Sequence, residues 1–281
     1  MESIDVTKRM INLYRDTFEL VTTTKEFEIA FKRGRISSMM GVEGGQMIEN
    51  SMAALRTFYD LGVRYMTLTH NCHTPWSESC CDPNPPPFEK GLGLTGFGKK
   101  IVHEMNRLGM MVDISHVAHA TMHAVLDITK APVIFSHSSS YTLCSIERNV
   151  PDEVLERLHE TDGVVMVNFY SGFVQCDHSV EATVLDVADH VEHIAKIAGR
   201  HRVGLGADYD GVNTTPRGLE DVSKYPNLFA ELIKRGWSNH DLIALAGKNF
   251  LRVWERVEHV RDRLSKELPE ESLLEEQDLS L

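Results

Sequence analysis

Six short apolar runs, separated by segments with helical periodicity, constrain the fold of this chain more than any other feature of its sequence. Each run is nearly uninterrupted, as a strand buried on both faces of a sheet requires. The intervening segments repeat apolar residues every three or four positions, and several end on glycine, as helices commonly do. The alternation predicts a parallel sheet covered by helices. The predicted strands are ISSMMGVE (36–43), RYMTLTH (64–70), MMVDISH (110–116), PVIFSH (132–137), VVMVNFY (164–170) and RVGLGADYD (202–210). The predicted helices include residues 47–62, 97–109, 120–129, 151–163 and 184–199.

The positions of polar residues favour one of the two folds built on such a sheet. Five of the six runs carry an acidic or histidine side chain at or near their end, namely Glu43, His70, His116, His137 and Asp208. Barrel enzymes assemble their sites from the ends of several strands, whereas a doubly wound sheet usually has a glycine-rich phosphate turn at one point. No such turn follows a run. We therefore predict an α/β fold of the (β/α)8 TIM-barrel type. The six runs are two fewer than the eight strands of such a barrel, and only helix-like sequence precedes residue 36.

Length and composition limit the class of protein. We predict one barrel domain over residues 1–265, followed by a flexible acidic tail over residues 266–281. The net charge of −12 argues against a nucleic-acid partner. No apolar stretch is long enough to be a transmembrane segment. Five cysteines without a CxxC pair make a finger-type zinc site a poor interpretation.

Glu43, His116 and His137 predict a metal site. A carboxylate and two imidazoles at strand ends are ligands that zinc or a similar divalent ion requires. Taken singly, each residue also fits a buried polar group that is satisfied by hydrogen bonds. The histidines in helical and loop segments are interpreted as solvated surface residues: His73, His103, His119, His123, His159, His178, His190 and His193.

Eight short motifs occur in an order that resembles a known family. They are GVEGG, RYMTLTHNC with TPW, VDISHV, PVIFSHSS, RNVPDEVL, MVNFY, GADYDGV and GLEDVSKYPNL. Together they resemble the membrane (renal-type) dipeptidases, zinc peptidases with an amidohydrolase-like barrel. The resemblance extends from about residue 3 to about residue 260, nearly the whole chain.

The resemblance implies two zinc ions and their ligands. Glu43 matches the carboxylate that bridges the two ions, and His116 and His137 match the other ligands of the second ion. A bridging carboxylate holds two cations close together and lets a shared water lose its proton near neutral pH. The glycines around Glu43 are expected to let metals and substrate approach the backbone.

The resemblance also assigns the catalytic and substrate-binding residues. His70 matches a histidine that binds and polarises the scissile carbonyl. Arg148 matches an arginine that holds the terminal carboxylate of the substrate, and a guanidinium suits this task because it forms planar, bidentate pairs. Asp208 matches the residue that manages the proton of the bridging water. Cys144 and Cys176 match positions that form a disulfide in the family.

One family feature is missing from the sequence. The resemblance implies a His-x-Asp pair that completes the first zinc site, and no such tripeptide occurs in the 281 residues. The first ion would then keep only Glu43, while the second would keep Glu43, His116 and His137. We therefore expect an N-terminally truncated barrel without its first two strands, with one zinc ion in place of two.

The resulting hypothesis is a zinc-dependent dipeptidase, in which a metal-bound hydroxide attacks the peptide bond while Arg148 holds the substrate. The resemblance implies a homodimer and small dipeptide substrates. Two alternatives stay open: a catalytically impaired dipeptidase-like binding protein, and another amidohydrolase-type activity such as a deaminase or lactonase. Family members are lipid-anchored to membranes or extracellular, but residues 1–281 show no signal-peptide or anchor segment. The cellular compartment is therefore left open.

Overall fold

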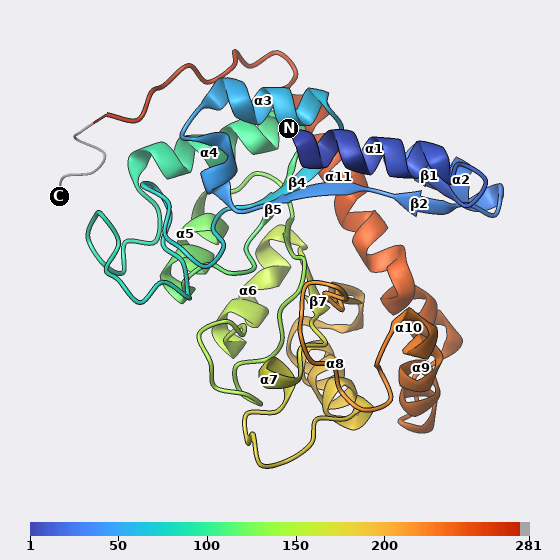
Figure 1. Cartoon of the computed structure of the whole chain (residues 1–281). Coiled ribbons are helices and arrows are strands. Elements are labelled where there is room, and N and C mark those ends of the chain that lie inside the picture. Colours follow the sequence, from blue (N-terminus) through green and yellow to red (C-terminus); the bar gives the residue numbers. More distant parts are fainter. Residues whose placement is uncertain (276–281) are drawn as a thin grey trace.

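A six-stranded parallel sheet lies at the centre of the fold. The computed structural model describes residues 1–275 (Figure 1). Each strand of this sheet pairs with the next one along the chain, in the order β3-β4-β5-β6-β7-β8. The strands are β3 (Met40–Glu43), β4 (Val63–Thr67), β5 (Met111–Asp113), β6 (Val133–Phe135), β7 (Val164–Val167) and β8 (Val203–Leu205). All six predicted runs therefore contribute to one parallel sheet, in the sequential order of barrel strands.

The register of the sheet brings the candidate site residues to one edge. Glu43 pairs with Thr67, Thr67 with Asp113, and Asp113 with Ile134. Because parallel strands share a direction, the segments that follow their carboxyl ends all emerge at this edge.

Helices connect successive strands, as the sequence predicts. The helices are α1 (Glu2–Leu13), α2 (Thr24–Lys32), α3 (Met52–Asp60), α4 (Gly96–Leu108), α5 (His119–Ile128), α6 (Asp152–Thr161), α7 (Ser171–Val174), α8 (Val184–Ala198), α9 (Tyr225–Lys234), α10 (Asn239–Ile243) and α11 (Asn249–Leu264). Local signals set several ends: the hydroxyl of Thr95 accepts from the backbone of Gly98 at the start of α4, and Gly109 ends this helix with φ 81°. Among the described residues, no helix is long and apolar enough to cross a membrane.

Successive residues of the strands pack alternately into two apolar clusters, one on each face of the sheet. Val112, Phe135 and Val165 join a cluster with the helices α3 to α9, whose largest members include Trp76 and Phe97. Met111, Ile134 and Val164 join a second cluster with Val253, Trp254 and Val257 of α11. The strands are thus buried on both faces, which explains why their sequences are nearly continuous apolar runs.

The segment before residue 36 differs from the prediction. Phe18–Leu20 is not helical but forms a strand, β1, which pairs in parallel with β2 (Ile36–Ser38) in a separate two-stranded sheet. The predicted run 36–43 is therefore divided between two sheets. Helix α1 ends because the chain turns after Tyr14, whose carbonyl accepts from the backbone of Thr17 and Phe18. Figure 1 shows β1, β2 and α2 projecting together from the main sheet.

The glycines around Glu43 serve packing. A Cβ at Gly41 would overlap the ring of Tyr65 on the neighbouring strand. A Cβ at Gly45 would lie 2.5 Å from both the carbonyl oxygen of Leu68 and the ring of Trp76. Gly44 has φ 104°, a conformation that side chains disfavour. The expectation that these glycines open a path for metal or substrate is therefore wrong, because protein atoms fill the space beside Gly41 and Gly45.

The predicted acidic tail is described only in part. Residues 276–281 lie outside the described residues. Before them, the backbone of Glu270 donates to Glu104 Oε2 and its carbonyl accepts from Arg56, at 3.2 and 2.9 Å. Lys100 Nζ donates to Ser272 Oγ at 2.7 Å. This part of the chain thus lies along α3 and α4, while the domain boundary at residue 265 stays a prediction.

Candidate metal centre

The three predicted metal ligands lie close together at the edge of the sheet formed by the carboxyl ends of its strands. Glu43 ends β3, and His116 and His137 follow β5 and β6 by three and two residues. Glu43 Oε1 lies 3.2 Å from the Nε2 atom of each histidine, and the two Nε2 atoms are 2.9 Å apart. The structure therefore brings one carboxylate oxygen and two ring nitrogens to a single point.

This arrangement fits a small divalent ion. Zinc binds imidazole nitrogen and carboxylate oxygen at about 2.0–2.2 Å in tetrahedral geometry, which places neighbouring ligand atoms about 3.3 Å apart. The separations of 2.9 and 3.2 Å among Glu43, His116 and His137 are close to this spacing. The donor set of two nitrogens and one oxygen is also one that zinc accepts.

The electrostatics of the cluster favour the ligand forms of two of its members. The hydrogen bond with His116 holds the pKa of the Glu43 carboxyl well below its usual range. Burial lowers the pKa of His116 to about 4. At neutral pH the cluster therefore holds an ionised carboxylate and a neutral His116 imidazole, the forms that bind metal.

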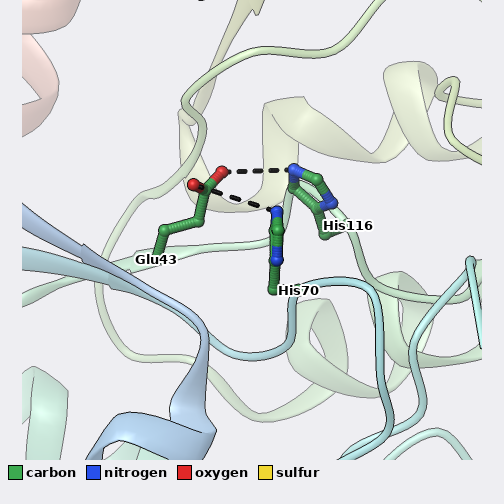
Figure 2. Close-up of side chains that lie close together, drawn as sticks. All are labelled: Glu43, His70 and His116. Carbon is green, nitrogen blue, oxygen red and sulfur yellow. Dashed lines mark ion pairs between the residues drawn. The ribbon is translucent and has the colours of Figure 1, made fainter. Parts of the chain in front are cut away.

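His70 lies beside these three residues. Its Nε2 atom is 3.9 Å from Glu43 Oε2, and its ring centroid is 4.5 Å from that of His116. One potential ligand atom from each of Glu43, His70 and His116 falls within 4.8 Å of the others. Figure 2 shows the three side chains pointing toward one another. The side chain of His70 is 37% exposed, so it is open to solvent on one side.

Asp208 faces the same cluster from the turn after β8. Its Oδ2 atom lies 3.9 Å from His137 Nε2 and accepts from Asn168 Nδ2 at 3.5 Å. Asp208 and His116 both have left-handed backbone angles, φ 63° and 62°. Non-glycine residues adopt this conformation at a cost, and it is often found at functional sites. Asp210 has φ 67° in the same turn.

Arg148 is buried with much of its hydrogen-bonding capacity unused. Its side chain donates from Nη1 to Ser138 Oγ at 2.8 Å, and the guanidinium lies over the ring of Phe173. Nε and Nη2 have no hydrogen-bond partner within the described part of the chain. Burial lowers the pKa of Arg148 to about 10, partly offset by the charges of Asp113, Asp208 and Glu43. A buried cation with two unused donor atoms is suited to bind an anionic group.

The predicted disulfide is confirmed. Cys144, in the loop after β6, is bonded to Cys176, which follows α7. A second disulfide, which the sequence did not predict, joins the adjacent residues Cys80 and Cys81. Cys72 is a free, exposed thiol.

Most of the histidines interpreted as surface residues have protein partners. His159 and His178 are exposed, as expected, and the others of this set are partly or fully buried. Both ring nitrogens of His73 form hydrogen bonds, with Ser79 N and Asn84 O, and order the loop after β4. The interpretation is wrong for His190, which is fully buried in α8. Its Nδ1 accepts from the backbone of Ser140, and its Nε2 donates to the carbonyl of Val174.

The burial of His190 predicts a specific loss of stability in acid. Burial lowers its pKa to about 4, whereas an unfolded histidine titrates near about 6.5. Below pH ~6.5 the unfolded chain binds the extra proton first, so the contribution of His190 to the free energy of unfolding falls by about 3 kcal/mol as the pH drops to ~4. Urea unfolding at several pH values measures this loss. His190→Gln should show a pH dependence weaker by that amount, and identical slopes in the two proteins would contradict the assignment.

Three polar residues of the site were not singled out from the sequence. Ser136 directly precedes His137 and donates a hydrogen bond to Asp113, and Asn168 donates one to Asp208. Each is a polar residue within or directly after an apolar strand run, and that break in the pattern was the available signal. Asn168 supplies the polar group of the one run, VVMVNFY, in which no functional side chain was expected.

A parallel sheet with carboxylate and imidazole ligands gathered beyond the carboxyl ends of its strands defines the class of metal-dependent hydrolases with barrel-type α/β folds. The comparisons with known proteins agree. The family model of the membrane dipeptidases, peptidase family M19, matches residues 1–268. The chain belongs to this family.

Individual relatives are similar over most of this chain. Two proteins of Schizosaccharomyces pombe named as uncharacterized dipeptidases are 50% and 49% identical over 95% and 92% of it. The chain spans only 64% and 62% of the length of these two relatives. Among solved structures, a metallo peptidase from Rhodobacter sphaeroides is 29% identical, with a TM-score of 0.83, over 90% of this chain and 72% of that one. A probable dipeptidase from Pseudomonas aeruginosa, 21% identical with a TM-score of 0.85 over 92% of this chain and 78% of that one, shows the same fold.

Proposed function

We propose that this chain is a zinc-dependent dipeptidase. The observation that carries the proposal is the pairing of two features at one edge of the sheet: the convergent donor atoms of Glu43, His116 and His137, and the buried guanidinium of Arg148 with two unused donors. The Rhodobacter sphaeroides structure supports the substrate class, because it is liganded with a phosphinate mimic of the dipeptide L-Ala-D-Ala.

In this proposal Glu43, His116 and His137 hold the zinc ion. A bound zinc ion would polarise the substrate carbonyl and lower the pKa of a water molecule. His70, partly exposed beside the cluster, donates a hydrogen bond to the carbonyl oxygen of the substrate as negative charge develops on it. Asp208 accepts the proton of the attacking water and returns it to the leaving amine.

Arg148 selects the substrate by its free carboxylate. The guanidinium is fixed by Ser138 and by the ring of Phe173, so binding a carboxylate requires little reorganisation. A charged partner also removes the penalty of an unpaired buried cation. In a dipeptide the free carboxylate lies one residue from the peptide bond that is cleaved. This favours a dipeptidase over a deaminase or lactonase, whose substrates need no such group.

The test is hydrolysis of cysteinylglycine and leucylglycine by purified chain. We expect turnover that a chelator abolishes and zinc restores, and much slower turnover of the corresponding dipeptide amides, which lack the carboxylate. Equal rates on dipeptides and their amides would reject the role of Arg148. Zinc binding without any turnover would support the alternative, a non-catalytic binding protein.

A further inference from the structure

Asp113 is a buried carboxylate that the proposed reaction does not use. It ends β5 and is fully inaccessible to solvent. It accepts four hydrogen bonds: from Thr67 Oγ1 at 2.6 Å, Ser115 N at 3.0 Å, Ser136 N at 2.9 Å and Ser136 Oγ at 2.5 Å. Among residues 1–275 no cationic side chain forms an ion pair with it, and the charge of Arg148 acts on it only without direct contact. Burying a carboxylate without an ion pair is costly, so these hydrogen bonds must compensate the lost hydration.

The two serines that donate to Asp113 lie next to the two candidate histidine ligands in the sequence. Ser115 directly precedes His116, and Ser136 directly precedes His137. Asp113 Oδ1 therefore accepts hydrogen bonds from the backbone N–H groups of Ser115 and Ser136, directly before the two histidines. The His116 carbonyl is held in turn by Thr69 Oγ1 at 2.9 Å. These contacts fix His116 in its left-handed backbone conformation, which would otherwise be unfavourable.

The Ser136 hydroxyl determines which ring nitrogen of His137 carries the proton. A hydroxyl has one proton, and Ser136 Oγ donates it to Asp113 Oδ2 because a carboxylate can only accept. The 2.8 Å contact between Ser136 Oγ and His137 Nδ1 must then be donated by an Nδ1–H group. In the neutral imidazole, this leaves the lone pair on Nε2, the atom that faces Glu43 and His116.

We propose that Asp113 and Ser136 are positioning residues of the metal centre. Asp113 sets the backbone before both histidines, and Asp113 acting through Ser136 selects the His137 tautomer whose Nε2 can bind a metal ion. Groups behind a metal ligand commonly fix its tautomer and orientation in this way. The inference rests on the proposed function for the presence of a metal, but not for the hydrolysis of peptides.

The chain offers a matched control for the key variant. Ser139, three residues after Ser136, is also buried, but its hydroxyl has no hydrogen-bond partner among the described residues. Ser136→Ala and Ser139→Ala therefore remove the same atom from the same segment, and only the first removes a contact with a ligand. Thermal unfolding of both variants tests whether the fold is retained.

The experiment reads the tautomer and the metal affinity. In 15N-histidine-labelled, metal-free protein near pH 7.5, long-range 1H–15N spectra report which nitrogen of His137 carries the proton, with His137→Gln identifying the signals. Wild type and Ser139→Ala should show Nδ1–H, and Ser136→Ala should show protonated Nε2 in part or all of the molecules. In zinc titrations against a competing chelator, Ser136→Ala should bind about 10- to 100-fold more weakly than wild type, while Ser139→Ala binds as wild type does.

Two outcomes would overturn the proposal. One is a wild-type His137 that carries its proton on Nε2, a result that does not depend on Ser136→Ala and therefore holds even if that variant fails to fold. The other is equal zinc affinity of Ser136→Ala and Ser139→Ala. Neither measurement uses peptide hydrolysis. A protein with the expected tautomer and zinc affinities but no dipeptide turnover would reject the proposed function and leave this inference standing.

Discussion

Glu43→Gln is expected to lower dipeptide turnover at least about 1,000-fold, because metal catalysis contributes several kcal/mol to such reactions. Glu43 Oε1 lies 3.2 Å from both His116 Nε2 and His137 Nε2. Glutamine keeps the size of the side chain but removes the negative charge that a divalent ion needs from this ligand. Because the Glu43 side chain is 46% exposed, the substitution should not disturb the fold. Steady-state kinetics on a dipeptide at saturating zinc measures the effect.

Glu49→Gln is the control for this prediction. Glu49 is exposed and lies six residues further along the chain, outside the set of candidate ligands. The same chemical change there should leave both kcat and KM unchanged. Comparable losses in the two variants, or wild-type turnover in Glu43→Gln, would contradict the assignment of Glu43 as a metal ligand.

Arg148→Met should have opposite effects on activity and stability. Loss of the guanidinium should reduce kcat/KM for dipeptides about 100- to 1,000-fold, the scale expected when a buried charged partner is removed. The free protein should keep its stability or gain about 1–3 kcal/mol in the free energy of unfolding, because a buried cation without an ion pair is replaced by an apolar side chain of similar length. The depressed pKa of Arg148, about 10, reflects the penalty that the charged form carries in the folded state at neutral pH.

Arg235→Met provides the comparison. Arg235 forms ion pairs with Asp189, Glu192 and Glu231 on the surface of α8 and α9, far along the chain from the ligand residues. Its replacement should lower stability slightly and leave dipeptide kinetics unchanged. If Arg148→Met instead lost several kcal/mol of stability and kept its activity, Arg148 would be a structural residue and the substrate assignment would be wrong.

The sequence predicted the parts of the fold that depend on local patterns. The six apolar runs became six neighbouring parallel strands because burial on both faces requires such runs. Strand β1 was missed because Phe18–Leu20 is short and becomes a strand only by pairing with residues 36–38. The glycines beside Glu43 were misread because their neighbours, Tyr65 and Trp76, come from distant segments.

The candidate site was predictable in its residue types but not in its supporting contacts. The candidate ligand residues lie at or just after the ends of strands, and the topology of a barrel brings these strand ends together. The hydrogen bonds of Asp113 depend on register and on rotamers, which no sequence pattern specifies. His190 is a different case, since Val187, His190, Val191 and Ile194 share one helical face and are all buried. That spacing was available in the sequence and indicated a buried histidine.

The most direct test of Glu43 as a metal ligand is zinc binding by the purified, metal-free chain, measured by titration against a chelator with metal analysis of the product. We predict one tightly bound zinc ion per chain that is retained in Glu49→Gln and lost in Glu43→Gln. A chain that binds no zinc, or one whose zinc affinity is the same in both variants, would contradict it.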